Sequence, residues 1–377
     1  MKVLVLSCDT GGGHNTCGRA VMEACRQRQI PCGMDDAFRF VSPTLSRCVS
    51  YGFDRVYRHT PKLFSAGWRY SERHPRAFRR KSAAYRFWIL GARKLARLIQ
   101  EQGYDTVVCT HMFSGLLATE ARDRHGLSVR TCFVATDYTW YPGCGSYDLD
   151  VSYIPHQDLT DGYMKVGVPQ DRIVASGIPV REAFLHREER AAARRALGLP
   201  EDCRHLMIMG GSMGCGPIAE LAALLPGLLP EDHHVSILCG NNRSLAEELE
   251  QRCAGDERFH IYGFTDLVPR LMDSADLYLT KPGGISVTEA AHKRLPMVFV
   301  NAVAGCETHN LNFFLSHGAA VTADTPEELA QTCLALLDDP ARLAEMAAAM
   351  APVAEQDPCE TILKQLGEIV PRKRSVV

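Results

Sequence analysis

The sequence predicts an α/β protein with two Rossmann-like domains, each a doubly wound parallel sheet, that face one another across a cleft. Apolar runs typical of buried strands alternate with helical patterns in two successive rounds along the chain. Several of these runs end in a glycine turn that leads into a helix. The chain of 377 residues is long enough for two hydrophobic cores. We therefore expect a first domain over residues 1–185, a second over residues 186–355, and a closing helix with a basic tail over residues 356–377.

Composition and charge exclude several classes of protein. The formal net charge of -2 argues against a dedicated nucleic-acid binder. The cysteines are scattered without any CxxC pair, so we expect them to be small apolar residues in a reducing cytosol, with neither a zinc site nor a redox motif. The first apolar run is too short for a signal peptide. No apolar run reaches the ~18 residues that a membrane span needs.

The first round begins with a predicted strand over residues 2–7, the turn Gly11-Gly-Gly-His14 and a helix over residues 15–29. Further strands are predicted over residues 106–110, 129–136, 151–154 and 172–175, with a helix over residues 157–166. The turn Ser176-Gly-Ile-Pro-Val180 closes this half. The charged stretch 187–195 and Leu197-Gly-Leu-Pro200 are predicted to be a linker.

Polar residues follow three of these strands, where a parallel sheet places its ligand. His14 lies on the lip of the first turn, while His111 and Asp137 follow the strands at 106–110 and 129–136. A histidine in such a place can take a proton from an attacking hydroxyl near neutral pH, so His14 is the candidate general base. Its alternative is a helix-capping histidine. Asp137 would orient or acidify the site, and His111 is equally well explained as a packed neighbour. The loop lacks GxGxxG spacing and the P-loop lysine, which argues against a dinucleotide or ATP site.

The second round contains predicted strands over residues 206–209, 235–238, 259–262, 276–280 and 297–300. Helices are predicted from residue 217 and over residues 244–253, 267–274 and 286–293, and residues 326–369 are helical and alanine-rich.

Two glycine turns in this round predict a diphosphate site. Met209-Gly-Gly-Ser-Met-Gly214 and Lys281-Pro-Gly-Gly284 each follow a strand. Without a Cβ at Gly283 or Gly284, a ligand can press against the backbone, and the N–H groups and positive end of the next helix attract a diphosphate. Glu289, about one turn into that helix, would accept hydrogen bonds from a ribose diol. Each turn alone is equally compatible with an ordinary connection between strand and helix.

Glu307 and Asn310 lie at the start of a later predicted helix. They are three positions apart, so their side chains share one face and would bind sugar hydroxyls together. The alternative is that they only stabilise the helix N-terminus, where such residues are common.

Residues 55–97 form a basic aromatic segment. It holds thirteen Lys or Arg residues against one acid, Glu72, and it contains Trp68 and Trp88. Basic side chains near an anionic bilayer contribute about 1 kcal/mol each, and aromatic rings favour the headgroup level. The segment therefore predicts a surface that lies on a membrane. A solvated helical hairpin with its aromatics in the core, or a nucleic-acid groove, would have the same composition.

Taken together, these motifs resemble the monogalactosyldiacylglycerol synthase and processive diacylglycerol glucosyltransferase family. The resemblance runs from about residue 1 to about residue 340. It implies a GT-B fold of glycosyltransferase family 28 and inverting transfer of glucose or galactose from a UDP-sugar to the 3-hydroxyl of diacylglycerol. The motifs that carry it are Gly11-Gly-Gly-His14, Thr136-Asp137, Ser176-Gly-Ile-Pro-Val180, Gly210-Gly-Ser-Met-Gly214, Gly263-Phe264, Lys281-Pro-Gly-Gly284 with Glu289, and Gly305-x-Glu-x-x-Asn310.

The resemblance also implies roles for individual residues. His14 is similar to the base that activates the acceptor, with Asp137 as the second catalytic residue. The glycine loops resemble diphosphate cradles, Glu289 the ribose ligand, and Glu307 and Asn310 the sugar ligands. The donor-binding set is Gly211, Ser212, Met213, Asn241, Gly263, Phe264, Lys281, Gly283, Gly284, Ile285, Ser286, Glu289, Glu307 and Asn310. The acceptor and membrane set is Gly12, Gly13, His111, Tyr141, Trp68, Arg69, Arg79, Arg80 and Lys81.

The partners implied are a UDP-sugar, diacylglycerol and anionic membrane lipids, with no nucleic acid, no cofactor and no metal. We therefore expect a cytoplasmic protein that binds peripherally to the inner face of the cell membrane. Asp148-Leu-Asp150 resembles the metal-binding DxD of another class of glycosyltransferases. Because it precedes an apolar strand and the chain has the other architecture, we expect a structural turn there.

The sequence departs from the family pattern at two positions. Tyr141 stands near a position where the family usually has histidine, which bears on the acceptor. Cys306 stands where the family usually has glutamine, which bears on the sugar. Three alternatives stay open: a related enzyme acting on another lipid or a peptidoglycan precursor, a UDP-sugar epimerase or hydrolase, and a non-catalytic membrane-associated UDP-sugar sensor.

Overall fold

The structure of the chain is a computed structural model. It describes residues 1–10, 12–49, 52, 66–67, 69–71, 73–74, 82–141, 143–211, 214, 216–300 and 305–370. Six of the residues proposed for the site, Trp68, Arg79, Arg80, Lys81, Ser212 and Met213, lie outside these ranges.

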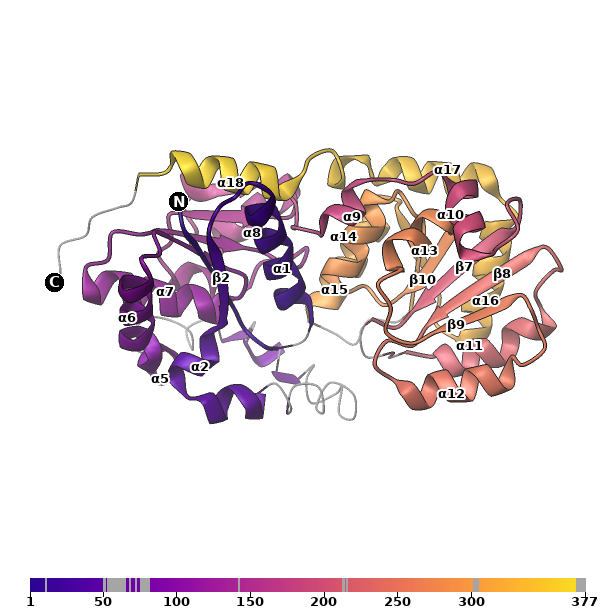
Figure 1. Cartoon of the computed structure of the whole chain (residues 1–377), viewed down its shortest axis with the longest axis horizontal. Coiled ribbons are helices and arrows are strands. Elements are labelled where there is room, and N and C mark those ends of the chain that lie inside the picture. The colour runs from indigo at the N-terminus through magenta and orange to yellow at the C-terminus, as the bar shows by residue number, and fades with distance from the viewer. Residues whose placement is uncertain are drawn as a thin grey trace. The chain divides into compact units, whose positions relative to one another are not determined.

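The chain divides into two compact units. The first comprises Met1–Glu182, Ala304–Cys306 and Gln356–Val377, and the second comprises Ala183–Val303 and Glu307–Glu355. Each unit contains a six-stranded sheet in which every strand pair is parallel, and Figure 1 shows each sheet flanked by helices. The predicted α/β class with two doubly wound parallel sheets is therefore confirmed.

The sheet of the first unit has the strand order β2-β1-β3-β4-β5-β6. Its elements are β1 (Val3–Ser7), α1 (Gly12–Gln27), β2 (Cys32–Asp36), α2 (Ala37–Val41), α5 (Ala83–Trp88), η2 (Ile89–Gly91), α6 (Ala92–Gln102), β3 (Thr106–Cys109), α7 (Met112–His125), β4 (Arg130–Val134), η3 (Cys144–Ser146), β5 (Val151–Ile154), η4 (Gln157–Leu159), α8 (Thr160–Lys165), η5 (Gln170–Arg172), β6 (Ile173–Ala175) and α18 (Pro358–Glu368).

Local sequence explains the ends of these elements. The all-apolar start of β1 is fully buried, as a central strand of a parallel sheet must be. Helices α6 and α7 each end at a glycine in the left-handed region, Gly103 (φ 66°) and Gly126 (φ 60°), where a side chain would be strained. Strand β2, with the sequence CGMDD, was not predicted, because it has neither an apolar run nor an alternating pattern.

Helix α18 belongs to the first unit although it comes from the end of the chain (Figure 1). Two hydrogen bonds join this end of the chain to the sheet. Arg130 Nε donates to the carbonyl of Ile369, the residue after α18, at 2.7 Å. The Tyr153 hydroxyl donates to the carbonyl of Ile362, which lies in α18, at 3.4 Å. Its buried side chains, among them Leu363 and Leu366, face the unit.

The sheet of the second unit has the order β12-β11-β10-β7-β8-β9. Its elements are α9 (Glu182–Leu185), which begins at the boundary, α10 (Arg190–Leu197), β7 (Arg204–Met209), α11 (Ile218–Leu224), η6 (Leu225–Gly227), β8 (His233–Leu238), α12 (Arg243–Arg252), β9 (Phe259–Tyr262), α13 (Val268–Ser274), β10 (Leu277–Thr280), α14 (Gly284–His292), β11 (Met297–Phe299), α15 (Cys306–Ser316), β12 (Ala320–Thr322), α16 (Pro326–Leu337), α17 (Pro340–Ala349) and η7 (Ala351–Val353).

The predicted linker at 187–195 is wrong, since most of it lies in helix α10. The Glu189 side chain caps this helix by accepting the N–H groups of Ala191 at 3.1 Å and Ala192 at 2.8 Å. Gly198 (φ 74°) ends it. The many charged residues indicated a solvated linker, and a helix of eight residues has too few apolar positions to show a helical pattern in the sequence. Strand β12 was also not predicted.

Within the described ranges, no helix combines the length and the apolar character that crossing a membrane requires.

Candidate active site

His14 lies in the first turn of α1 with a fixed ring orientation. Its Nδ1 lies 2.7 Å from the carbonyl oxygen of Thr110. Because a carbonyl only accepts hydrogen bonds, Nδ1 carries the hydrogen, and Nε2 keeps a lone pair. The sequence placed His14 on a loop, whereas the structure has the helix begin at Gly12, two residues earlier. Gly12 and Gly13 thus form the N-terminal end of this helix.

A chain of hydroxyl groups links His14 to Asp137. The Thr136 hydroxyl lies 3.0 Å from His14 Nδ1 and 3.2 Å from the Tyr141 hydroxyl. Tyr141 in turn donates to a carboxylate oxygen of Asp137 at 2.7 Å. The structure therefore brings together three residues that the sequence proposed, His14, Asp137 and Tyr141, and adds Thr136 between them.

The electrostatics of the first unit keep His14 neutral. Burial lowers its pKa below the ordinary value for histidine, and the nearby charge of Asp137 and the bond to Thr110 oppose that shift. Burial, followed by the Asp137 charge, raises the pKa of Tyr141 well above its ordinary value, so Tyr141 remains a hydrogen-bond donor. At neutral pH the arrangement offers an unprotonated Nε2, which is what a general base requires.

His111 packs against His14 edge to face, with ring centroids 4.6 Å apart. It also caps α7, since its Nδ1 accepts the N–H of Phe113 at 3.1 Å. Burial, and then the proximity of His14, lower the pKa of His111 well below its ordinary value. His111 is therefore a packed neighbour of His14 at the same strand edge, and its role in acceptor binding stays a prediction.

The aromatic end of the basic segment reaches this site. Trp88 stacks on Phe113 with ring centroids 4.1 Å apart, and the centroid of its ring lies 5.2 Å from that of the buried Phe38. Phe87 and Leu90, by contrast, are 42% and 66% exposed. The alternative that the aromatics fill the core is thus correct for Trp88, while Phe87 and Leu90 lie at the surface. Arg69 is exposed as well.

In the second unit, the two glycine turns lie side by side. They follow β7 and β10, which are neighbours in the sheet, and the Thr280 hydroxyl donates to the carbonyl of Met209 at 2.9 Å. Gly211 has φ 72°, and a Cβ there would lie 2.8 Å from Cε of Lys281. The backbone conformation of Gly211 therefore favours glycine, and a side chain there would also displace the end of the Lys281 side chain.

The second turn is held by the first residues of α15. Lys281 Nζ pairs with Glu307 at 2.9 Å, and Asn310 Nδ2 donates to the carbonyl of Pro282 at 2.9 Å. Asn310 is fully buried and Glu307 nearly so. In this structure both side chains support the turn, and contact with a sugar stays a prediction.

The turn opens onto free space at Gly283. A Cβ at this glycine would meet no atom of the described residues within 4 Å, and its φ of -79° is ordinary, so no described residue requires glycine there. A ligand that approaches the backbone would explain the missing side chain. Gly284 begins α14, which carries Ile285, Ser286 and the buried Glu289.

Two further turns at the same edge of this sheet carry predicted donor ligands. Asn241 follows β8 and is exposed. Gly263 and Phe264 follow β9, and the Phe264 ring is 72% exposed. An exposed phenyl ring is suited to stacking on a flat base, and the predicted role of Phe264 in donor binding stays a prediction.

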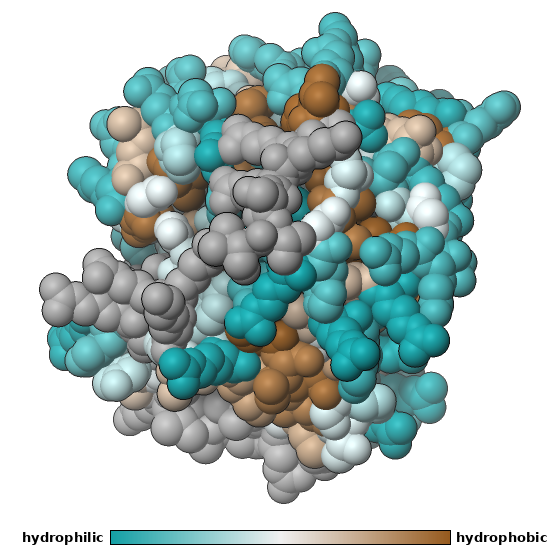
Figure 2. All heavy atoms as spheres, turned by 90° about the vertical axis from the view of Figure 1, so that its left-hand side faces the viewer, coloured by the Kyte–Doolittle hydropathy of each residue, from teal (hydrophilic) through white to brown (hydrophobic). Residues whose placement is uncertain are grey.

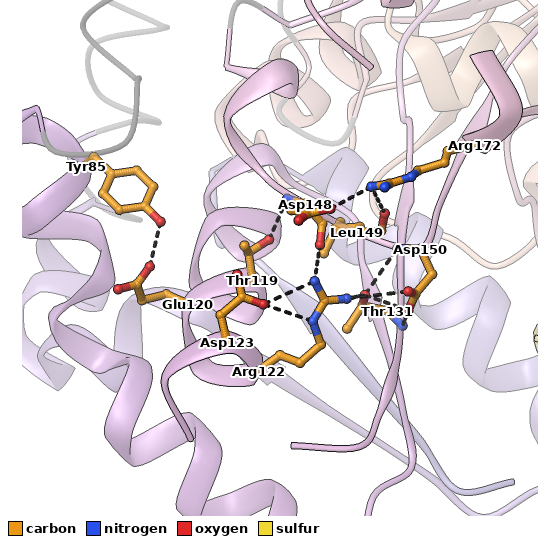
Figure 3. Close-up of polar contacts among 10 residues, drawn as sticks. All are labelled: Tyr85, Thr119, Glu120, Arg122, Asp123, Thr131, Asp148, Leu149, Asp150 and Arg172. Atoms are coloured by element: carbon orange, nitrogen blue, oxygen red, sulfur yellow. Dashed lines mark hydrogen bonds and ion pairs between the residues drawn. The ribbon is translucent and has the colours of Figure 1, made fainter. Parts of the chain in front are cut away.

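Asp148 and Asp150 are held by arginines (Figure 3). Asp148 pairs with Arg172 at 2.6 Å, and Asp150 accepts from the Thr131 backbone at 2.8 Å and lies 3.5 Å from Arg122 Nη1. Arg122 is buried and also donates to the Asp148 carbonyl. The interpretation of this triplet as a structural turn agrees with these contacts.

Sequence reasoning missed Thr110 and Thr136. The Thr110 contact comes from its backbone, which any residue would supply. Thr136 stands directly before Asp137, and its hydroxyl at the end of a strand was the available signal.

Two family models match the chain. That of monogalactosyldiacylglycerol (MGDG) synthase matches residues 14–180, and that of the glycosyltransferase family 28 C-terminal domain matches residues 205–362. A processive diacylglycerol beta-glucosyltransferase of Bacillus mycoides (strain KBAB4) is 26% identical over 365 residues, which cover 96% of this chain and 92% of the relative.

Solved structures resemble the chain over nearly its whole length. MurG of Acinetobacter baumannii has a TM-score of 0.66 at 18% identity and covers 98% of this chain and 100% of its own. Anabaena Alr3699/HepE in complex with UDP has a TM-score of 0.59 at 15% identity and covers 98% and 99%. At such identities the likeness concerns the fold, and the predicted GT-B fold is confirmed.

Proposed function

Because the chain belongs to the monogalactosyldiacylglycerol synthase and processive diacylglycerol glucosyltransferase family, we propose that it transfers glucose or galactose from a UDP-sugar to diacylglycerol at a membrane surface, with inversion. The observation that carries this proposal is the hydrogen bond of His14 Nδ1 to Thr110, which leaves Nε2 as a base. Residues 1–185 would bind acceptor and membrane, and residues 186–355 the donor. Residues 356–377 would be the closing helix and tail.

The chemistry is a single displacement. The 3-hydroxyl oxygen of the acceptor attacks the anomeric carbon as the bond from that carbon to UDP breaks, and His14 Nε2 takes the hydroxyl proton. Asp137 stabilises the imidazolium that forms, since its charge already favours the protonated ring. Thr136 and Tyr141 keep the Asp137 carboxylate in place through the hydroxyl chain.

The donor would be held by the adjacent glycine turns of the second unit. The open space at Gly283 suits a diphosphate on the backbone N–H groups at the start of α14, where they stabilise the charge that develops on UDP. Glu289 would bind the ribose, Phe264 the base, and Glu307 the hexose. With fixed dipoles in this role, the reaction needs no cofactor or metal.

Membrane binding would use the basic aromatic end of the first unit. Figure 2 shows this end of the molecule, where brown apolar spheres reach the surface among teal hydrophilic ones. Phe87 and Leu90 of this segment are exposed, and so are its Arg86, Arg93 and Lys94. This combination suits an anionic bilayer, because apolar rings enter it while cations face its headgroups. The protein would then act as a peripheral protein on the inner face of the cell membrane.

A groove in the same unit supports the lipid partner. It has a volume of about 330 Å³, and its apolar lining residues are Phe40, Pro43 and Leu98. Arg39, Lys94 and Arg97 line it too, together with two acids.

A second candidate acceptor, another lipid-linked substrate or a peptidoglycan precursor, is favoured by Tyr141. Its hydroxyl donates a hydrogen bond to Asp137, and Tyr141 stands near a position where the family usually has histidine, so acceptor contacts would differ.

The test is incubation with UDP-glucose or UDP-galactose and diacylglycerol in anionic liposomes, with products identified by mass spectrometry. A hexosyl-diacylglycerol that is absent with His14→Ala is expected. Release of UDP only with a lipid-linked acceptor other than diacylglycerol would establish the second candidate. Binding of UDP-sugar and liposomes without release of UDP would mean a sensor, and formation of a free or epimerised sugar would mean a hydrolase or epimerase.

A further inference from the structure

A cavity of about 510 Å³ lies in the second unit, away from the glycine turns. Its walls are the loop ahead of α10 (residues 187–190), the end of α13 and the loop between α14 and β11 (residues 293–295). Ala275 and Leu295 line it, and they come just before β10 and β11. The cavity therefore lies at the N-terminal edge of the parallel sheet, whereas the glycine turns follow the C-terminal ends of its strands.

The carboxylates that line this cavity already have partners. Asp273 pairs with the buried Lys293 at 2.6 Å, and Lys293 also donates to the His186 carbonyl. Glu188 pairs with Arg270 at 2.9 Å. Glu189 accepts the backbone N–H groups at the start of α10. Of the three lining carboxylates, two are thus paired with cations and the third caps α10.

The lining cations are not all balanced. Arg190 pairs at 3.0 Å with Asp276. The side chains of Arg187 and Arg294 make no hydrogen bond or ion pair with any residue in the described ranges. Two guanidinium groups therefore remain at one cavity, a charge that suits a doubly negative ligand.

Arg294 stands where the backbone favours glycine. Its φ is 55°, in the left-handed region, because it follows the last turn of α14. The Arg294 N–H bonds to the Ala291 carbonyl at 3.0 Å and the Leu295 N–H to the Ala290 carbonyl at 3.0 Å, which is the usual glycine-ended helix terminus. A non-glycine residue is strained in this conformation. The chain nevertheless has a long cationic side chain there, and that side chain lines the cavity.

We propose that this cavity is a second anion site that binds a phosphomonoester, with Arg187 and Arg294 on the phosphate. A phosphomonoester carries nearly two negative charges at neutral pH, and the guanidinium fork matches phosphate oxygens in pairs. Met272, Ala275 and Leu295 supply apolar wall for the carbon part of the ligand. The volume lies within the roughly 300–1,000 Å³ of small-molecule sites. The ligand is either a soluble phosphomonoester or the headgroup of a phosphatidate.

The experiment titrates glycerol 3-phosphate into the full chain by calorimetry while UDP saturates the donor site. One further binding event is expected. Arg294→Gly should weaken it by about tenfold or more, since a charge-assisted contact is lost. Its melting temperature should equal or exceed that of the unmodified chain, because glycine relieves the left-handed conformation. Arg187→Gln should weaken binding in the same way, and Arg342→Gln on α17 controls for the loss of one positive charge.

A parallel arm uses vesicles of phosphatidate in phosphatidylcholine, compared with phosphatidylcholine alone. Binding to these vesicles that Arg294→Gly weakens, without binding of glycerol 3-phosphate, assigns the site to a lipid headgroup. Equal affinity of Arg294→Gly and the unmodified chain for both probes would overturn the proposal, as would no binding of either probe. UDP affinity, measured on the same samples, reports separately on the donor site.

Discussion

Lys281 Nζ lies 2.9 Å from a carboxylate oxygen of Glu307, and this pair joins the turn after β10 to the first turn of α15. The same lysine passes over Gly211 in the neighbouring turn. One side chain therefore contacts both glycine turns and a predicted sugar ligand. A donor bound at these turns, as proposed above, would meet a lysine that the pair with Glu307 already holds in place.

Glu307→Gln tests whether this carboxylate acts on the sugar or only on the turn. If it binds the hexose, turnover should fall by about tenfold while the affinity for UDP stays within about twofold, since a charge-assisted hydrogen bond is lost only with the sugar present. Steady-state kinetics and UDP calorimetry measure the two effects. Glu345→Gln, which breaks an exposed pair with Arg342, is the control. An equal loss of UDP and UDP-hexose affinity would assign Glu307 to the turn.

Gly283→Ala should leave the fold intact and weaken the donor. The added Cβ meets no atom within 4 Å in the part of the chain that the structure describes, and φ is ordinary, so the melting temperature should not fall. A diphosphate seated on the backbone would collide with the methyl group, and UDP affinity should fall by about tenfold or more. Gly227→Ala, also without a neighbour within 4 Å, is the matched control in the same unit. Normal UDP binding by Gly283→Ala would show that the diphosphate does not bind at Gly283.

His14→Gln should reduce turnover by about 100-fold or more while UDP still binds, because only the proton transfer is lost. Measurement of kcat and of UDP affinity on one preparation separates the two effects. Turnover close to that of the unmodified chain would remove His14 from the mechanism.

The pH profile tests the link between Asp137 and His14. Burial lowers the pKa of His14, so the base is neutral at pH 7, and kcat/KM should fall only below about pH 6.5. Asp137 raises that pKa by favouring the imidazolium. Asp137→Asn should therefore move the acidic limb to lower pH as well as reduce turnover. If the acidic limb of the Asp137→Asn variant moves to higher pH or does not move, Asp137 does not raise the pKa of His14.

Metal removal should not affect the reaction. Asp148 and Asp150 already balance Arg172 and Arg122, so we expect neither to bind a divalent cation. Turnover in excess EDTA should match turnover with added Mg²⁺ or Mn²⁺, and Asp148→Asn should leave that ratio unchanged. Loss of activity in EDTA that Mn²⁺ restores would reverse this conclusion.

His205 should make the second unit acid-labile. Burial lowers its pKa to about 3, and its ring nitrogens lie 2.9 Å from the Ser236 hydroxyl and 3.0 Å from that of Ser274. Above about pH 6.5 the histidine is neutral in both the folded and the unfolded chain. Between that pH and 3 only the unfolded chain takes up the proton, so the free energy of unfolding should fall by about 1.4 kcal/mol per pH unit.

Urea unfolding of the unmodified chain and of His205→Gln, at several values between pH 7.5 and 4, measures this contribution. The difference between the two proteins should shrink or reverse as the pH falls. A constant difference would show that His205 does not titrate in this way.

The sequence was informative where chemistry is tied to local pattern. The glycine turns at Gly211 and Gly283 and the histidine after β1 stand next to clear apolar strands, so their place at a strand edge follows from the order of elements. The Thr110 contact could not be predicted, because it joins backbone and side chain across 96 residues. The turn-supporting role of Asn310 was missed for the same reason, since it depends on a carbonyl far along the chain. Helix α10 was missed because its charges mask a narrow apolar side.

Helix α18 lies on the first unit, although every residue of the second unit's sheet comes between it and β6. No single cut in the polypeptide can therefore release the two halves intact. A fragment that stops at Glu182 would lack this helix, which supplies the carbonyl partner of Tyr153, and the residue after it, Ile369, whose carbonyl accepts from Arg130. Expression of the first half alone would require residues 356–370 to be grafted onto it or supplied as a separate peptide.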